Sequence, residues 1–416
     1  MSKKANVLML TENFLRLSTP SAQRLLAFAK TLDSNSYETF VITKSRVSLK
    51  SEKMKVVNAV SKKEIPLLDP ILLFLYFIKS LGVMRRHKIR LIISTVPKIN
   101  NAIVGFLLSK LFKVPHIIDI RDYWESQLLS YPMNRFFPKR LVSLLIDITS
   151  FLYSQASSLT TVNETLKKML VKRGIPYNRI YIIPNGADTS LYRPCEDKNH
   201  VKKLRKKYGL PLSKMIFVYG GALSPHNRFD IVLDGIASLR KTEDLLFLII
   251  GRPTFLMTND TILKWVETLG LRQTVKVAGP FPLEEAAEIF SCSDVGVIPL
   301  DNAEIWKHMI TAKVFAYLAS GLPILASGPN QSELEKFLAS HKVGVFIGPP
   351  SPMSFADGFR KFLRERRKMK NMGRKGREVM EERFDRHVLS RRILRVAHSV
   401  TSQHSGKVQL KDARAP

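Results

Sequence analysis

The sequence predicts an α/β protein made of two successive doubly wound domains, each a parallel sheet covered by helices on both faces. Two observations lead to this prediction. Short apolar runs typical of strands alternate with longer helix-like segments through residues 7–183, and the alternation begins again after residue 215. Strands separated by helices of this length form parallel sheets. The length of 416 residues also suits two large domains, at roughly 100–200 residues per domain.

The first half of the chain contains six expected strands separated by five expected helices. The strands are expected at residues 7–10, 39–43, 91–94, 116–120, 158–162 and 181–183. Apolar residues recur at helical spacing between them, which predicts helices at 21–32, 70–87, 101–112, 139–156 and 163–173. These elements predict an N-terminal domain of residues 1–190.

Turn-forming residues interrupt the alternation at residues 182–194 (IIPNGADTSLYRP), which predicts a hinge. Strands are then expected at 215–219, 245–250, 274–278, 295–299, 323–326 and 343–346. Helices are expected at 201–208, 229–241, 260–270, 283–292, 311–320, 332–340 and 354–367. The prediction is a C-terminal domain of residues 191–375, a helix over 376–400 that packs back towards the N-terminal domain, and a disordered tail over 401–416.

Composition excludes some classes of protein and favours others. Apolar residues make up 45% and charged residues 24%, which is ordinary for a globular chain. Two cysteines, Cys195 and Cys292, exclude a disulfide-stapled secreted fold, so a reducing compartment is expected. A net charge of +31 favours an acidic partner such as phosphate, nucleic acid or an anionic membrane. The basic residues are spread over both halves without a nucleic-acid-binding module, so no nucleic acid partner is expected.

The longest apolar run, residues 71–78 (ILLFLYFI), is too short for the roughly 18–20 residues of a spanning helix. Two interpretations stay open: a helix buried against a sheet, or a helix lying in a membrane interface, because RRHKIR follows at 85–90. The basic stretch 360–395 is likewise either a solvated helix face or a docking surface for acidic lipid. We expect a cytoplasmic protein, peripheral at the inner face of the cell membrane.

Loops that follow strands in the second half are candidate ligand sites, because ligands of open α/β sheets bind beyond the carboxyl ends of strands. Gly220 and Gly221 follow one strand and allow close backbone approach, although such a pair is also common in ordinary tight turns. Arg228, at the next helix start, and Arg252, after the following strand, are placed to bind a phosphate.

The most informative stretch is residues 298–327. A loop containing Asp301 and Glu304 follows a strand, and Thr311 is expected to be the N-cap of a helix. The free amides of Ala312 and Lys313, with the charge of Lys313, would suit a diphosphate. An ordinary loop, helix and strand without a ligand remains the alternative.

The loop DIRDYWES, residues 119–126, places two carboxylates, a guanidinium and an indole after a strand of the first half. Charges beside a buried strand are costly unless they are paired or functional. Asp119 and Arg121 therefore either pair with each other or take part in a site. The sequence lacks HExxH, CxxC, DxD, GxxxxGK[ST] and GxSxG motifs, so kinase, hydrolase and zinc-enzyme interpretations have no support.

The order of these motifs resembles the retaining nucleotide-sugar glycosyltransferases of family 4, which have the GT-B fold of two Rossmann-like domains facing across a cleft. The similarity covers about residues 5–395, and DIRDYW is most similar to the subgroup acting on lipid-linked sugars and surface polysaccharides. The segments that carry the resemblance are 21–32, 119–124, 161–170 (TVNETLKKML), 182–194, 218–224 (VYGGALS), 277–285 (VAGPFPLEE), 293–300 (SDVGVIPL) and 313–326 (KVFAYLASGLPILA).

The resemblance implies that the second domain binds a UDP- or GDP-sugar and that the first binds a lipid-linked or polysaccharide acceptor. Base contacts are expected from Gly279, Pro280 and Phe281. The remaining donor-binding residues are expected to be Gly220, Gly221, Arg252, Glu304, Thr311 and Ala312.

The expected catalytic residues are Asp122, Arg228 and Lys313, with Asp122 facing the sugar across the cleft. Asp119, Arg121 and Trp124 are expected on the acceptor side. The resemblance also implies front-face attack with retention of configuration. Amides and cations would stabilise the departing nucleoside diphosphate, so no metal and no other cofactor is expected.

Several positions depart from the family pattern. The family commonly has two glutamates eight positions apart, where this chain has His308 and Ala316. Ala222 and Asn227 stand where the family commonly has phosphate-binding cations. These departures leave open a second hypothesis, a degenerate non-catalytic homologue that acts as a partner in a glycan-assembly complex.

Overall fold

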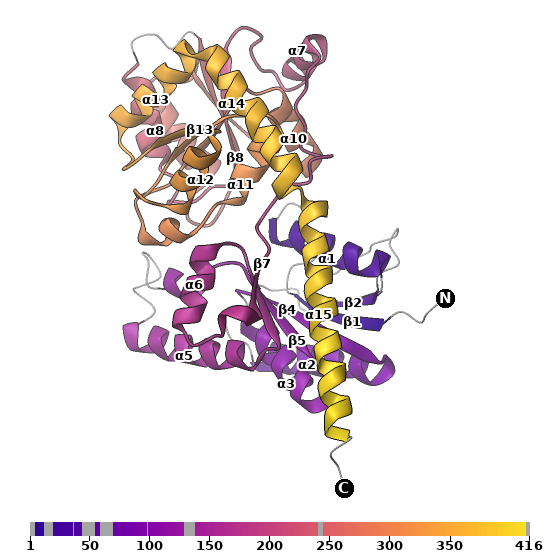
Figure 1. The fold of residues 1–416 in the computed structure, drawn as a ribbon. Helices are drawn as coiled ribbons and strands as arrows, with labels where there is room; N and C mark the ends of the chain where they lie inside the picture. Colours follow the sequence, from indigo (N-terminus) through magenta and orange to yellow (C-terminus); the bar gives the residue numbers. More distant parts are fainter. Residues whose placement is uncertain are drawn as a thin grey trace. The chain divides into compact units, whose positions relative to one another are not determined.

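The computed structural model describes residues 5–11, 20–35, 37–43, 55–58, 70–97, 99–128, 138–239 and 244–412. It divides the chain into two units, shown in Figure 1. The N-terminal unit comprises residues 1–184 and 387–416, and the C-terminal unit comprises residues 185–386. Each unit is built on one parallel sheet, which confirms the predicted pair of doubly wound α/β domains.

The sheet of the N-terminal unit has seven strands in the order β3-β2-β1-β4-β5-β6-β7. All of its pairings are parallel. Its central strands are apolar along nearly their whole length, as expected for a sheet covered on both faces. The strands are β1 (Ala5–Leu10), β2 (Tyr37–Thr43), β3 (Lys55–Asn58), β4 (Ile89–Val96), β5 (His116–Ile120), β6 (Ser158–Thr161) and β7 (Ile180–Ile182).

Two layers of helices cover this sheet. One buried cluster contains side chains of α1 and α15, and the clusters on the other face contain side chains of α2, α3 and α5. The helices are α1 (Pro20–Ser34), α2 (Pro70–Arg86), α3 (Ile99–Phe112), α4 (Trp124–Gln127), α5 (Lys139–Gln155), α6 (Glu164–Lys172), η2 (Tyr177–Arg179) and α15 (Arg386–Asp412).

The boundaries of the two units differ from the expected ones. They lie at 184/185 and 386/387 instead of 190/191 and 375/376. The reason is that both ends of the C-terminal unit bind each other: the amide of Ala187 donates to the Phe384 carbonyl at 3.2 Å, and the Thr189 hydroxyl donates to Asp385 at 2.7 Å.

Residues 401–412 are helical in the structure, where the sequence analysis expected a disordered tail. They continue α15, whose residues Ile393 and Val400 are buried in the N-terminal unit. Each residue added to an existing helix gains a backbone hydrogen bond, so an anchored helix extends readily into a polar sequence.

The sheet of the C-terminal unit has six parallel strands in the order β10-β9-β8-β11-β12-β13. From β8 the following strands β9 and β10 extend the sheet to one side, and from β11 the strands β12 and β13 extend it to the other. The loops after β8 and β11 therefore lie at the topological switch point, where ligands of such sheets bind. The strands are β8 (Met215–Ala222), β9 (Leu245–Arg252), β10 (Val275–Ala278), β11 (Val295–Pro299), β12 (Ile324–Ser327) and β13 (Gly344–Ile347).

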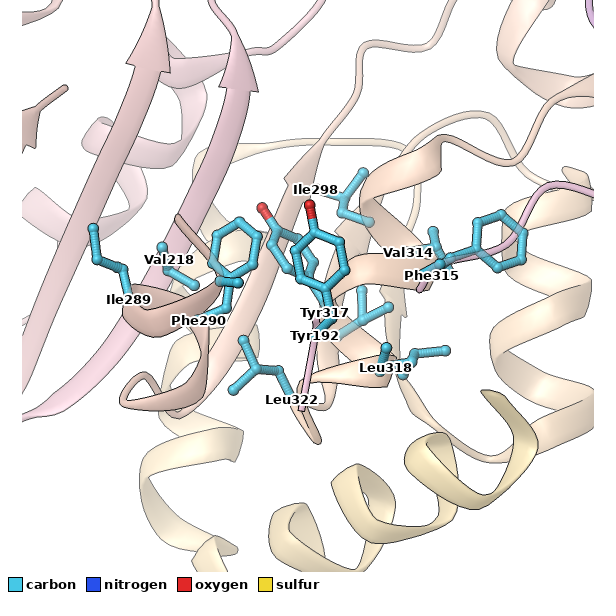
Figure 2. Packing of buried hydrophobic residues seen from close by; sticks show 14 of the residues in the cluster. Tyr192, Val218, Ile289, Phe290, Ile298, Val314, Phe315, Tyr317, Leu318 and Leu322 are labelled. Atoms are coloured by element: carbon cyan, nitrogen blue, oxygen red, sulfur yellow. The ribbon is translucent and has the colours of Figure 1, made fainter. Parts of the chain in front are cut away.

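Helices cover both faces of this sheet, and each face has its own buried cluster. Figure 2 shows one of these clusters, in which the rings of Phe290 and Tyr317 meet edge to face at 5.1 Å. The helices are α7 (Lys198–Lys207), α8 (Phe229–Ala237), α9 (Asn259–Thr268), α10 (Leu283–Ser291), η3 (Glu304–His308), α11 (Ala312–Ala319), α12 (Glu333–His341), α13 (Pro352–Arg364), α14 (Arg366–Val379) and the π-helical turn η4 (Met380–Phe384).

The apolar run at residues 71–78 lies in α2. Within the described part of the chain, none of the helices has the length and apolar character needed to cross a bilayer. Tyr76 of α2 is buried and donates a hydrogen bond to the Ile42 carbonyl, whereas Phe74 and Ile78 are exposed. The helix therefore packs on the sheet and also leaves an apolar side uncovered.

Candidate functional site

Hydrogen bonds join the two loops at the switch point of the C-terminal unit. The His226 ring lies 2.8 Å from an Asp301 carboxylate oxygen, and the Asp301 amide donates to the His226 carbonyl at 2.9 Å. The hydrogen bond to Asp301 raises the pKa of His226. The sequence analysis noted Asp301 as an acid in its loop but missed His226, because nothing in their spacing shows that the two loops meet.

Arg228 lies at the N-cap of α8, directly after this junction. Its backbone amide donates to the Pro299 carbonyl at 2.8 Å, and its guanidinium forms a forked ion pair with Asp230, with bonds of 2.9 Å from Nε and 2.7 Å from Nη2. Asp230 raises the pKa of Arg228, so this cation is permanent. The pair holds Arg228 at the strand end and offsets part of its charge, which the sequence did not show.

Lys313, in the first turn of α11, lies against the end of β8. A Cβ atom placed on Gly221 would lie 2.5 Å from Lys313 Cε, and Lys313 Nζ lies 5.0 Å from the ring centre of Tyr219. Lys313 forms no ion pair with any carboxylate in the described part of the chain. Burial lowers the pKa of Lys313 to about 8. The site therefore holds a partly buried cation that has no anionic partner among the described residues.

Thr311 occupies the N-cap position of α11 as predicted, but its side chain does not cap the helix. Its hydroxyl oxygen is buried and makes no hydrogen bond to any described residue, and the same holds for the indole nitrogen of Trp306. The first amides of a helix, here those of Ala312 and Lys313, have no partners within the helix. Among the described residues, the start of α11 therefore holds donors without acceptors, namely the Thr311 hydroxyl and the first amides of the helix.

The two glycines at the end of β8 have different roles. Gly221 has a φ of +145°, which disfavours any side chain, and it makes room for Lys313. The Gly220 amide donates to the Tyr317 hydroxyl at 2.8 Å, and a Cβ there would lie 2.6 Å from Phe290 Cζ. Gly220 therefore leaves no room for a side chain, and its amide is already used, while its expected contact with the donor stays a prediction.

The remaining expected donor residues lie around this cluster within the C-terminal unit. Arg252 ends β9 opposite Ala222 in the register and is exposed. Gly279 to Phe281 follow β10, and the Phe281 ring meets Tyr208 edge to face at 5.9 Å. Glu304, in η3, is exposed and binds Lys307 at 2.8 Å, so it lies in a surface ion pair.

Asp119 in the N-terminal unit is buried, and both of its carboxylate oxygens accept hydrogen bonds. It accepts hydrogen bonds from Arg24 at 3.0 and 3.2 Å and from the Thr160 hydroxyl at 2.6 Å. Burial by itself would raise the pKa of Asp119, but Arg24 holds it below its usual range. Its ion-pair partner is therefore Arg24 of α1 and not Arg121, whose guanidinium donates to the Val96 carbonyl.

Trp124 is only 4% exposed, and its indole nitrogen donates to the Tyr153 hydroxyl at 3.4 Å. It packs in the core of the N-terminal unit, and its expected place on the acceptor side stays a prediction. Asp122 is partly exposed after β5, and burial raises its pKa while Arg121 lowers it.

Among the described residues, no three His, Cys, Asp or Glu side chains form a group suited to a metal ion.

Two family models match the chain in succession. The model described as Glycosyltransferase Family 4 matches residues 21–191, and the model described as Glycosyl transferases group 1 matches residues 200–379. A D-inositol 3-phosphate glycosyltransferase of Corynebacterium glutamicum is 25% identical over 190 residues. That match covers 45% of this chain and 44% of the relative, so the chain spans less than half the length of this curated relative.

Solved structures share the architecture over almost the whole chain. HepE of Anabaena in complex with UDP and glucose superposes with a TM-score of 0.74 at 17% identity, covering 95% of this chain and 100% of that one. WaaG, a glycosyltransferase involved in lipopolysaccharide biosynthesis, superposes with a TM-score of 0.70 at 13% identity, covering 93% and 98%. The successive domain models and the shared fold show that the chain belongs to the GT-B glycosyltransferases, with a family 4 domain followed by a group 1 domain.

Proposed function

We propose that the protein transfers a sugar from a UDP- or GDP-sugar to a lipid-linked or glycan acceptor at the cytoplasmic face of a membrane, with retention of anomeric configuration. One observation carries the donor side of this proposal. Lys313 has no carboxylate partner in the described part of the chain, and it lies at a helix start with free amides, beside Gly221. A diphosphate supplies the negative charge that this cluster lacks.

The same cluster suits the chemical step. When the sugar leaves, negative charge accumulates on the nucleoside diphosphate, and fixed amides and cations at that point stabilise the transition state. Lys313 and Arg228 supply the cations, and Asp122 is the proposed catalytic residue of the N-terminal domain. Because the cations come from side chains, we also propose that transfer needs no metal ion.

The relatives support the classes of substrate. HepE is solved with UDP-glucose, which supports a nucleotide-sugar donor. WaaG is described as acting in lipopolysaccharide biosynthesis, and the corynebacterial relative as acting on an inositol phosphate. These descriptions support a polar glycan or lipid-linked acceptor and leave open which sugar is transferred.

The proposal is tested with a thermal-shift screen of UDP- and GDP-sugars, followed by an assay of transfer or donor hydrolysis with and without a chelator. A ligand that binds only the folded state raises the melting temperature. Arg228→Ala and Lys313→Ala are expected to lower the rate by about 100-fold or more, as loss of one oxyanion-stabilising group does elsewhere.

Arg272→Ala is the control, because Arg272 lies in the same unit in an exposed ion pair with Glu267. Unchanged rates in both site variants would contradict the assigned residues, and inactivation by the chelator would contradict the metal-free step. Absence of binding by every sugar nucleotide at millimolar concentration would contradict the proposed transfer and favour the alternative, a non-catalytic partner in a glycan-assembly complex.

Ala316 allows a gain-of-function test. It lies one turn after Ala312 on α11, where the family commonly has the glutamate that holds the ribose. Ala316→Glu is expected to tighten UDP binding by about tenfold, because a hydrogen bond to a charged group contributes about 1.5–3 kcal/mol. Ala237→Glu, at the exposed end of α8, adds the same charge elsewhere and should leave the dissociation constant unchanged. Equal affinity of the Ala316→Glu variant and the unmodified protein would show that the ribose does not lie at this helix.

A further inference from the structure

Three helices form one outer layer of the N-terminal unit. Helix α3 lies between α2 and α5 on the same face of the sheet, visible in Figure 1. Tyr76 of α2 shares a buried cluster with Val104 and Leu108 of α3. On the other side, Phe106 of α3 meets Phe151 of α5 edge to face at 5.9 Å. The three helices therefore present one continuous outer surface.

This outer surface is unusually apolar. Phe74 is 62% exposed and Leu111 is 60% exposed, and the apolar residues of α5 recur at helical spacing along its outer side. Soluble surfaces rarely gather large apolar side chains in this way unless they bind something. We call this set the apolar strip: Phe74, Leu75 and Ile78 of α2, Leu107 and Leu111 of α3, and Leu141, Leu144, Ile148 and Phe151 of α5.

The charges of the same helices are almost all positive. They contain one acidic residue, Asp147, and six basic ones, which are Lys79, Arg85, Arg86, Lys110, Lys139 and Arg140. Two copies of this chain that paired through the strip would bring these cations face to face, because a two-fold interface opposes a surface to itself. An anionic bilayer instead accepts apolar side chains below its headgroups and attracts the cations around them.

We propose that the apolar strip is the surface through which this protein docks on an anionic lipid bilayer, with α2, α3 and α5 lying against the membrane interface. The inference rests on the proposed work at a membrane and names the residues that make the contact. The proposal combines the two interpretations that the sequence left open for α2. The helix is buried against the sheet through Tyr76, and it lies in the membrane interface through Phe74.

The test is sedimentation of the full-length protein with vesicles of phosphatidylglycerol or of phosphatidylcholine. We expect binding to the anionic vesicles that weakens with salt, because the Debye length shortens. Leu144→Ser combined with Ile148→Ser should weaken binding by about tenfold or more, since both lose apolar contact with the bilayer. Lys139→Glu combined with Arg140→Glu should weaken it by a similar factor and reduce its salt dependence.

The matched control is Leu212→Ser combined with Leu263→Ser, which removes two comparably exposed leucines from the C-terminal unit. Thermal shift with UDP, measured on every variant, reports the donor site and folding independently of lipid. Vesicle binding that survives the α5 substitutions would overturn the proposal, whatever the outcome for transfer. It would also be overturned if the protein were a dimer without lipid and the α5 variant a monomer, because the strip would then be a self-interface.

Discussion

Lys313 is the residue on which the proposed donor site most depends. Its ammonium group lies over the Tyr219 ring and has no anionic neighbour among the described residues, so burial lowers its pKa to about 8. A bound diphosphate would supply that neighbour and raise the pKa again. By linkage, protonation of Lys313 and binding of the anion favour each other.

Affinity for UDP is therefore expected to fall as pH rises through about 8, because Lys313 then loses its charge in the free protein. The fall should reach up to about tenfold per pH unit if the neutral form binds poorly. The terminal phosphate, with a second pKa of about 6, is already ionised in this range and does not add to the effect.

Calorimetry between about pH 7 and about pH 9.5 measures this dependence. Lys313→Met keeps the length of the side chain and removes its charge, so the variant should bind weakly with a flat profile. The variant retains His226, so any contribution from that titration cancels in the comparison. A wild-type profile as flat as that of the variant would exclude Lys313 from the binding site.

The end of β8 and the start of α11 are in contact through Gly221 and Lys313. Gly221 leaves the space that Lys313 fills, and its φ of +145° is open to glycine.

The bounds of β5 and β11 agree with those predicted from apolar runs, since buried parallel strands are apolar throughout. β3 was not predicted, because its four residues, Lys55–Asn58, show no pattern of their own.

Gly221→Ala is expected to weaken UDP binding by about tenfold or more, because the new methyl group displaces Lys313 from the strand end. Gly174→Ala is the control, since Gly174 also has a positive φ but has no atom within 4 Å of the added Cβ. Calorimetry measures the affinity for UDP, and thermal melting measures the loss of stability that backbone strain causes. Equal affinity losses in both variants would point to strain and not to displacement of Lys313.

The N-terminal unit is completed by the last helix of the chain. α15 buries Leu389, Ile393 and Val396 in the same cluster as Val7 of β1 and Phe28 of α1. Its Ser390 accepts a hydrogen bond from Thr31 at 2.7 Å. Segments that are far apart in the sequence therefore share one core.

Ile393→Ala is expected to destabilise the protein by about 2–5 kcal/mol, the usual effect of emptying a buried aliphatic site. Denaturant unfolding measures it, with Arg391→Ala as the exposed neighbouring control on the same helix. Loss of stability within about 0.5 kcal/mol of that control would mean that α15 does not contribute to the core in solution.

The amino-acid sequence by itself determined the two parallel sheets, most of their strands and helices, and the family. These features depend on local apolar periodicity and on motif order. The sequence also placed Thr311 and Lys313 at a helix start and Gly221 at a strand end, because strand ends and helix starts can be located from the same patterns.

Only the tertiary structure decided which partner each polar group takes. It paired Asp119 with Arg24, Arg228 with Asp230 and His226 with Asp301, and it left Lys313 without a carboxylate among the described residues. It also placed Trp124 in a core and the Gly220 amide on Tyr317. The physical reason is that ion pairs and hydrogen bonds depend on distances of about 3 Å between residues far apart in the chain, which no local pattern encodes.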